Sequence, residues 1–74
     1  MNLTLIISDN CEACDRAKKV IEKFRENYSQ ITIETIHINS YHGKRISITP
    51  ALLIDQKLFS YGDIDESKLL SKLN

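Results

Sequence analysis

The sequence predicts an α/β fold in which helices flank a mixed four-stranded sheet. An apolar run over residues 3–8 leads directly into a helical spacing of apolar residues, and two further apolar runs lie two residues apart near the C-terminus. The predicted order of elements is β-α-β-(short α)-β-β-α. A chain of 74 residues is long enough for one small domain, so we expect residues 1–74 to form a single unit.

The first strand and the first helix have the clearest patterns. Residues 3–8 are apolar on both faces, which is typical of a central strand. From Glu12 to about Asn27, apolar residues recur every three or four positions, as on one face of a helix. These residues are Ala13, Ala17, Val20, Ile21, Phe24 and Tyr28. Asn10 or Cys11 can cap the start of this helix.

A second strand is predicted from the isoleucines at positions 31, 33, 36 and 38. Their spacing changes phase near Glu34-Thr35, which indicates either a bulge or a change in the buried face. Residues 39–49 begin with turn-forming residues, and a short helix is the most that this segment could hold.

The C-terminal third predicts a hairpin and a helix. Pro50 opens a strand over 51–54, Asp55-Gln56 form a tight turn, and a fourth strand over 57–61 ends at Gly62. The last helix is capped either by Asp63, with Glu66 three residues on, or by Asp65, with Ile64 packing on Leu69. Its predicted buried stripe consists of Leu69, Leu70 and Leu73.

This order of elements predicts the sheet. Two strands joined by a helix should be parallel with a right-handed crossover, and the last two strands should form an antiparallel hairpin. Helices on the faces of such a sheet account for every apolar segment of the chain.

Charge and hydropathy exclude several classes of function. Ten basic and ten acidic residues give a formal charge of zero, so no basic face for nucleic acid is expected. No apolar run approaches the ~20 residues of a membrane span, and the N-terminus shows no signal peptide. We expect a cytoplasmic monomer with neither a nucleic-acid nor a membrane partner.

Cys11-Glu12-Ala13-Cys14 lies where the first strand ends and the first helix begins. Unpaired N–H groups and the positive end of the helix dipole favour a thiolate there, which is the reactive form of cysteine. The second thiol is one turn away and can close a disulfide with the first. So short a bridge removes little entropy from the unfolded chain, and therefore redox chemistry or metal binding explains the pair better than a structural disulfide.

Two alternatives to redox chemistry remain. His37 and His42 extend the cysteine pair to C-x2-C…H-x4-H, which are the right ligand types for tetrahedral zinc, although the gap between the pairs is longer than in a zinc finger. Alternatively, the cysteines are redox-idle. In both cases the chain would be a binding module rather than an enzyme.

Three features together give the chain a resemblance to the thioredoxin-like superfamily in its minimal, glutaredoxin-sized form. They are the C-x-x-C after the first strand, Thr49-Pro50 at the head of the third strand, and Tyr61-Gly62-Asp63-Ile64 before the last helix. The resemblance covers nearly the whole chain. It implies a minimal thioredoxin-like fold and a dithiol–disulfide oxidoreductase that serves electron transport and redox homeostasis.

The resemblance also implies roles for individual residues. Cys11 would be the exposed nucleophile and Cys14 the buried resolving thiol. Pro50, if cis, would hold the Thr49 backbone beside Cys11, where an extended substrate could pair with it. Gly62 and Asp63 would complete the substrate-binding site, because Asp63 matches the acid that meets the glutathione amino group in glutaredoxins.

The chain departs from the superfamily patterns at several positions. Leu5 replaces the buried acid of thioredoxins, Ser8 stands where glutaredoxins usually have Lys, and Ser60-Tyr61 correspond to their Gly-Gly pair. We therefore expect a preference for protein disulfides over glutathione mixed disulfides. The chemistry needs no metal or organic cofactor, but it needs a reductase or a small thiol as electron donor.

Overall fold

A computed structural model describes residues 1–43 and 45–73, with the side chain of Leu73 left out. The elements, in chain order, are β1 (Asn2–Ile7), α1 (Glu12–Asn27), β2 (Thr32–His37), the 3-10 helix η1 (Ile38–Ser40), β3 (Ala51–Ile54), β4 (Lys57–Tyr61) and α2 (Glu66–Leu73). The short helix predicted within 39–49 is thus a single 3-10 turn that begins one residue earlier. Neither helix in the described part of the chain is both long and apolar enough to cross a membrane.

The four strands form one mixed sheet in the order β2-β1-β3-β4. β1 pairs with β2 in parallel and with β3 in antiparallel, and β3 and β4 form the predicted antiparallel hairpin. Asp55 and Gln56, in the turn between them, both have positive φ, which matches the turn type that two-residue hairpins favour.

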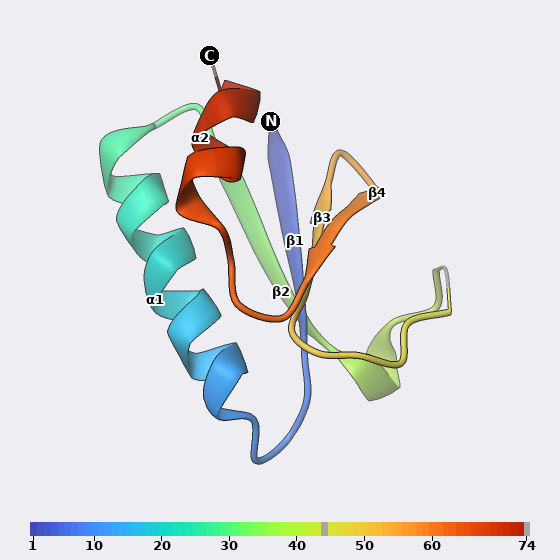
Figure 1. Ribbon diagram of the computed structural model, residues 1–74. Coiled ribbons are helices and arrows are strands. Elements are labelled where there is room, and N and C mark those ends of the chain that lie inside the picture. The colour runs from blue at the N-terminus through green and yellow to red at the C-terminus, as the bar shows by residue number, and fades with distance from the viewer. Residues whose placement is uncertain (44, 74) are drawn as a thin grey trace.

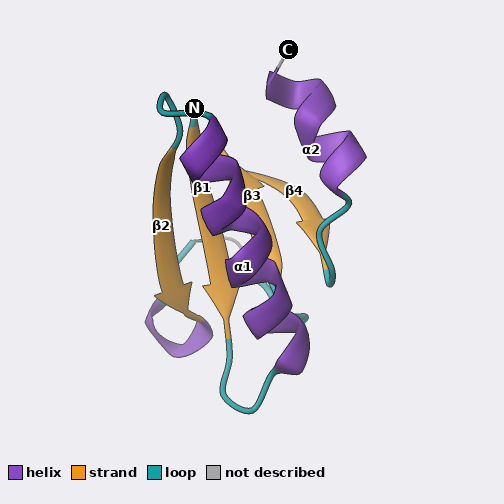
Figure 2. Ribbon diagram, turned by 90° about the vertical axis from the view of Figure 1, so that its left-hand side faces the viewer, coloured by secondary structure: helices purple, strands orange, loops and turns teal. Residues whose placement is uncertain are grey.

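The helices α1 and α2 lie on the same face of the sheet, whereas η1 lies on the other (Figures 1 and 2). The core is divided accordingly. The helical face buries Leu3, Leu5, Ala17, Ile21, Phe24, Ile31, Leu52 and Leu69. The opposite face buries Ile6, Ala51 and Leu53, against which Ile36, Ile38, Tyr41 and Ile46 pack.

This division explains the irregular spacing of isoleucines in β2. The register between β1 and β2 runs without interruption from Asn2↔Thr32 to Ile7↔His37, so the bulge considered near Glu34-Thr35 is absent. The alternative, a change in the buried face, is correct, because Ile33 packs on the helical face and Ile36 packs on the opposite face. A register shift does occur in the hairpin, between Leu52 and Leu53 of β3.

The start of α2 follows the second of the two predicted caps. The Asp65 side chain accepts a hydrogen bond from the Lys68 N–H, and the helix begins at Glu66. Leu69 is fully buried, but Leu70 is 38% exposed, so the prediction that Leu70 belongs to the buried stripe is wrong. The predicted burial of the Leu73 side chain lies outside the described residues. Successive residues of a helix lie about 100° apart around its axis, so a helix that packs on the core with one side can bury Leu69 and leave Leu70 in contact with water.

Candidate redox site

The cysteine pair lies where β1 leads into α1, with Cys11 directly before the helix and Cys14 in its first turn. Asn10 has a φ of 53°, a left-handed conformation that Asn tolerates better than most residues, and this reverses the chain after β1. Cys11 is then the N-cap of α1, and its sulfur accepts a hydrogen bond from the Cys14 N–H at 3.0 Å. The two candidate caps therefore have different tasks: Asn10 makes the turn and Cys11 makes the cap.

Cys11 and Cys14 form a disulfide, with their Cα atoms 5.1 Å apart. Cys11 is partly exposed, whereas Cys14 is only 2% exposed and faces the core from the first turn of α1. Cys11 is thus partly accessible to solvent, whereas Cys14 is shielded from it. Disulfide exchange requires two sulfurs that are close enough to form and break a bond with each other, and Cys11 and Cys14 meet this requirement.

Thr49 lies beside Cys11, and Pro50 follows it at the head of β3. The peptide bond between them is cis, and the Thr49 hydroxyl approaches the Cys11 sulfur to 4.0 Å. Pro50 is buried, and its carbonyl accepts a hydrogen bond of 2.7 Å from the Gly62 N–H. Gly62 has a φ of 75°, a conformation that residues with a side chain rarely adopt. This hydrogen bond therefore joins the residue before β3 to the residue after β4, next to the cysteine pair.

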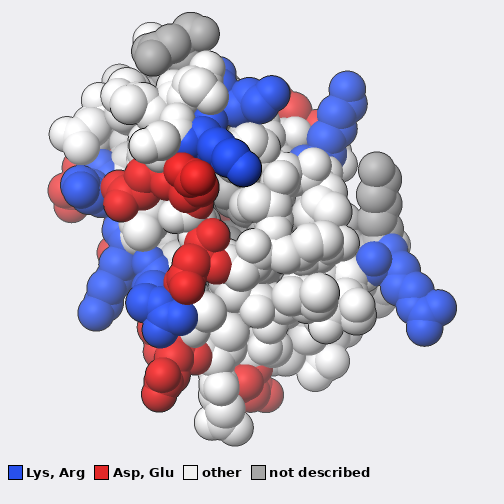
Figure 3. Space-filling model, viewed as in Figure 1, with Lys and Arg blue, Asp and Glu red and all other residues white. Residues whose placement is uncertain are grey.

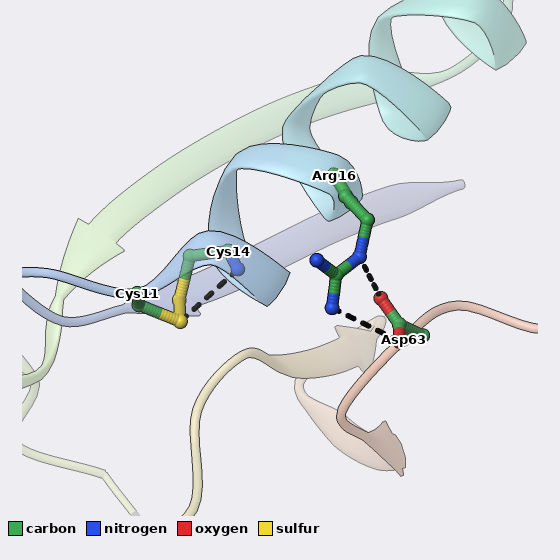
Figure 4. A network of polar contacts seen from close by, with 4 residues as sticks. All are labelled: Cys11, Cys14, Arg16 and Asp63. Atoms are coloured by element: carbon green, nitrogen blue, oxygen red, sulfur yellow. Dashed lines mark hydrogen bonds and ion pairs between the residues drawn. A yellow bond between two sulfur atoms is a disulfide. The ribbon is translucent and has the colours of Figure 1, made fainter.

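Asp63, the remaining predicted substrate-binding residue, is engaged by a side chain that the sequence analysis did not single out. Both carboxylate oxygens of Asp63 accept hydrogen bonds from the Arg16 guanidinium, at 2.9 and 3.3 Å. Figure 4 shows the disulfide at the start of α1 and Arg16 reaching from the same helix across to Asp63. The hydrogen bond from Arg16 lowers the pKa of Asp63, which keeps the carboxylate charged and paired.

Ser8 is a second residue whose partner the sequence analysis missed. Its hydroxyl lies 2.6 Å from the hydroxyl of Thr49, so it is linked through Thr49 to the Cys11 sulfur. The sequence contained no local signal for this contact, because it depends on the register between β1 and β3. Antiparallel pairing of the predicted first and third strands with Ile6 opposite Ala51 continues to Ser8 opposite Thr49.

Exposed apolar side chains adjoin the site. Ile48, which precedes Thr49, is 55% exposed, and Tyr61, which precedes Gly62, is 44% exposed. Figure 3 shows that many of the charged side chains on this face lie over α1 and α2, whereas the middle of the face is largely uncharged. The reactive pair thus adjoins a surface with an apolar component.

The structure does not assemble the zinc site considered as an alternative. His37 makes a contact of 3.2 Å with Asp9 through Nε2, and its Nδ1 accepts a hydrogen bond from the Asn39 N–H. Within residues 1–43 and 45–73, no three His, Cys, Asp or Glu side chains are grouped so that they could hold a metal ion. The C-x2-C and H-x4-H patterns are therefore not combined in a ligand set among these residues.

Residues 1–74 match a family model described as a thioredoxin domain. No curated protein matches the chain. The family match confirms the resemblance that the three sequence features indicated. Together with the two helices and the mixed four-stranded sheet, it also confirms the predicted α/β, thioredoxin-like fold.

Proposed function

Because the chain belongs to the thioredoxin domain family, we propose that it is a dithiol–disulfide oxidoreductase and that Cys11 and Cys14 are its catalytic residues. The observation that supports this most directly is the unequal exposure of two cysteines that are close enough to form a disulfide. The pair also lies at a helix N-terminus, where the positive end of the dipole favours a thiolate.

The proposed reaction has two exchange steps. The Cys11 thiolate attacks one sulfur of a substrate disulfide, which forms a mixed disulfide with Cys11 and releases the other substrate sulfur as a thiolate. Cys14 loses its proton and attacks the Cys11 sulfur, which releases the second substrate thiolate and closes the Cys11–Cys14 disulfide. The substrate gains two electrons and the protein loses two. An external reductase or small thiol restores the dithiol.

We propose that protein disulfides are better substrates than glutathione mixed disulfides. Ser8 offers no positive charge to a glutathione carboxylate, and the loss of one charge-assisted contact costs about tenfold in affinity. Asp63 is already paired with Arg16, and Tyr61 presents a ring where glutaredoxins have a small residue. The exposed Ile48 beside Thr49 suits instead the apolar side chains of a polypeptide.

The test compares kcat/KM for insulin with kcat/KM for a glutathionylated peptide, under one reductant system. We expect insulin to be the better substrate, and Cys14→Ser to abolish its multiple-turnover reduction. Efficient deglutathionylation that survives Cys14→Ser would instead show a monothiol mechanism and contradict the proposed preference. Absence of activity on both substrates would contradict the proposed function.

A further inference from the structure

Two hydroxyl groups connect the end of β1 to the sulfur of Cys11, the partly exposed cysteine. The Ser8 and Thr49 hydroxyls lie 2.6 Å apart, and the Thr49 hydroxyl is oriented to donate to Cys11 Sγ at 4.0 Å. Ser8 is 41 residues from Thr49 in sequence, and both are only partly exposed. The contact therefore depends on the pairing of β1 with β3.

The number of available protons determines which hydroxyl is the donor in each hydrogen bond. Each hydroxyl has a single proton to donate. If Thr49 donates its proton to the Cys11 sulfur, only Ser8 can supply the proton of the hydrogen bond between the two hydroxyls. Ser8 then donates to Thr49 and Thr49 donates to Cys11, an arrangement in which each bond polarises the next.

A reduced Cys11 would use these donors most when it is a thiolate. Its sulfur would then carry a negative charge that two groups already face in this structure, the Cys14 N–H and the Thr49 hydroxyl. Hydrogen bonds to a charged sulfur favour the thiolate over the thiol.

We propose that Ser8 is a positioning residue for the redox reaction: by donating to Thr49 Oγ1, it directs the Thr49 hydroxyl to the Cys11 sulfur and so stabilises the Cys11 thiolate. The proposal rests on the proposed role of Cys11 as the nucleophile. It gives Ser8 a task that does not depend on contact with substrate.

Charged groups close to Cys11 in the chain must stay constant in any test. Asp9 precedes it and contacts His37, and Glu12 and Asp15 lie in the first turn of α1. All three carboxylates belong to exposed residues, and the test leaves them and His37 unchanged.

The test measures the rate of iodoacetamide reaction at Cys11 as a function of pH, in reduced full-length protein, with peptide mapping to assign the labelled site. Ser8→Ala and Thr49→Val should each raise the pH midpoint and slow the reaction at neutral pH. Thr49→Val removes the hydrogen bond to the charged sulfur and should slow the reaction about tenfold, whereas Ser8→Ala removes a bond between neutral groups and should slow it about fivefold. Ser8→Thr, which keeps the hydroxyl, should restore the wild-type midpoint. Ser40→Ala and Thr35→Val are matched controls at exposed positions and should leave it unchanged.

The double variant Ser8→Ala/Thr49→Val separates positioning from a direct effect. If Ser8 acts through Thr49, adding Ser8→Ala to Thr49→Val should move the midpoint no further. A wild-type midpoint in Ser8→Ala, or an undiminished effect of Ser8→Ala in the Thr49→Val protein, would overturn the proposal. Should Thr49→Val fail to fold, Thr49→Ser keeps the donor, and a raised midpoint in that variant would overturn it equally.

Insulin reduction, measured on the same proteins, keeps the two proposals distinguishable. Midpoints that shift as expected in a protein that does not reduce insulin would support the role of Ser8 and contradict the oxidoreductase function. Normal insulin reduction with an unshifted midpoint in Ser8→Ala would contradict the role of Ser8 alone.

Discussion

At the residue scale, the two cysteines share one bond but lie in different surroundings. Cys11 caps α1 from a partly exposed position, and its sulfur accepts the N–H of Cys14. Cys14 belongs to the buried face of the same helix, beside Ala17. The sulfur of Cys11 therefore accepts a backbone hydrogen bond, whereas Cys14 at the other end of the disulfide is shielded from water.

This difference predicts unequal reactivity of the two thiols. In reduced protein at neutral pH, Cys11 should react with iodoacetamide at least about tenfold faster than Cys14, because only Cys11 combines access with stabilisation of the thiolate. Peptide mapping after brief alkylation measures both rates. Equal rates in the folded protein would argue against the assigned roles, and denatured protein, in which both thiols are exposed, provides the control.

At the element scale, Arg16 and Asp63 connect α1 to the loop between β4 and α2. The two residues are 47 positions apart in sequence, and both are more than half exposed. Such pairs usually contribute little to stability, although a guanidinium that meets both carboxylate oxygens is a favourable geometry. Lys23 and Glu66 make a longer contact of 3.6 Å between α1 and the start of α2.

The Arg16–Asp63 pair predicts a small pH-dependent term in stability. The pKa of Asp63 is lowered in the folded protein by the hydrogen bond from Arg16, so the stabilisation is present above the ordinary value of 3.8 and is lost as the pH falls through the lower, folded value. Asp63→Asn should therefore lower the Tm slightly at neutral pH, and the difference from wild type should vanish in strong acid. Thermal unfolding followed by circular dichroism at several pH values measures this.

Salt provides the control for this prediction. Because the pair is exposed, high ionic strength at neutral pH should also reduce the difference between Asp63→Asn and wild type. Arg16→Gln should behave like Asp63→Asn, and combining the two substitutions should add little. A difference in Tm that stays constant from neutral pH to strong acid would show that Asp63 stabilises the loop by some other means.

At the scale of the whole molecule, stability depends on a small core divided between two faces of one sheet. A chain of this length is expected to have a free energy of unfolding of roughly 4–11 kcal/mol, so a single buried leucine represents a large share of it. Leu69 is fully buried against the helical face, whereas its neighbour Leu70 is 38% exposed. Of these two leucines, Leu69 therefore makes most of the apolar contact between α2 and the core.

Two substitutions of the same type in one helix test this attachment. Leu69→Ala should destabilise the protein by about 2–5 kcal/mol, because it removes buried methyl groups and leaves a cavity. Leu70→Ala should cost well under half as much, since its side chain already contacts water. Urea unfolding measures both values, and comparable losses would show that Leu70 is as much a part of the core as Leu69.

Local patterns predicted most of the elements. The helical spacing between Glu12 and Asn27 gave the bounds of α1, and the two-residue break at Asp55-Gln56 gave the hairpin turn between β3 and β4. The alternatives that stayed open in the sequence were decided by the contacts that the structure shows. Asp65 accepts the Lys68 N–H at the start of α2, whereas Asp63 pairs with Arg16 of α1.

The sequence by itself determined the order and type of the elements, the placement of Cys11 and Cys14 at a helix start, and the family resemblance, because these depend on residues within a few positions of one another. Only the tertiary structure decided that Ser8 meets Thr49, that Arg16 meets Asp63, and that both helices share one face of the sheet. The first two of these contacts join residues that are 41 and 47 positions apart in sequence, and the two helices lie at opposite ends of the chain. Such contacts are fixed by how strands pair and helices pack, since local periodicity reports which face of an element is buried but not what lies against it.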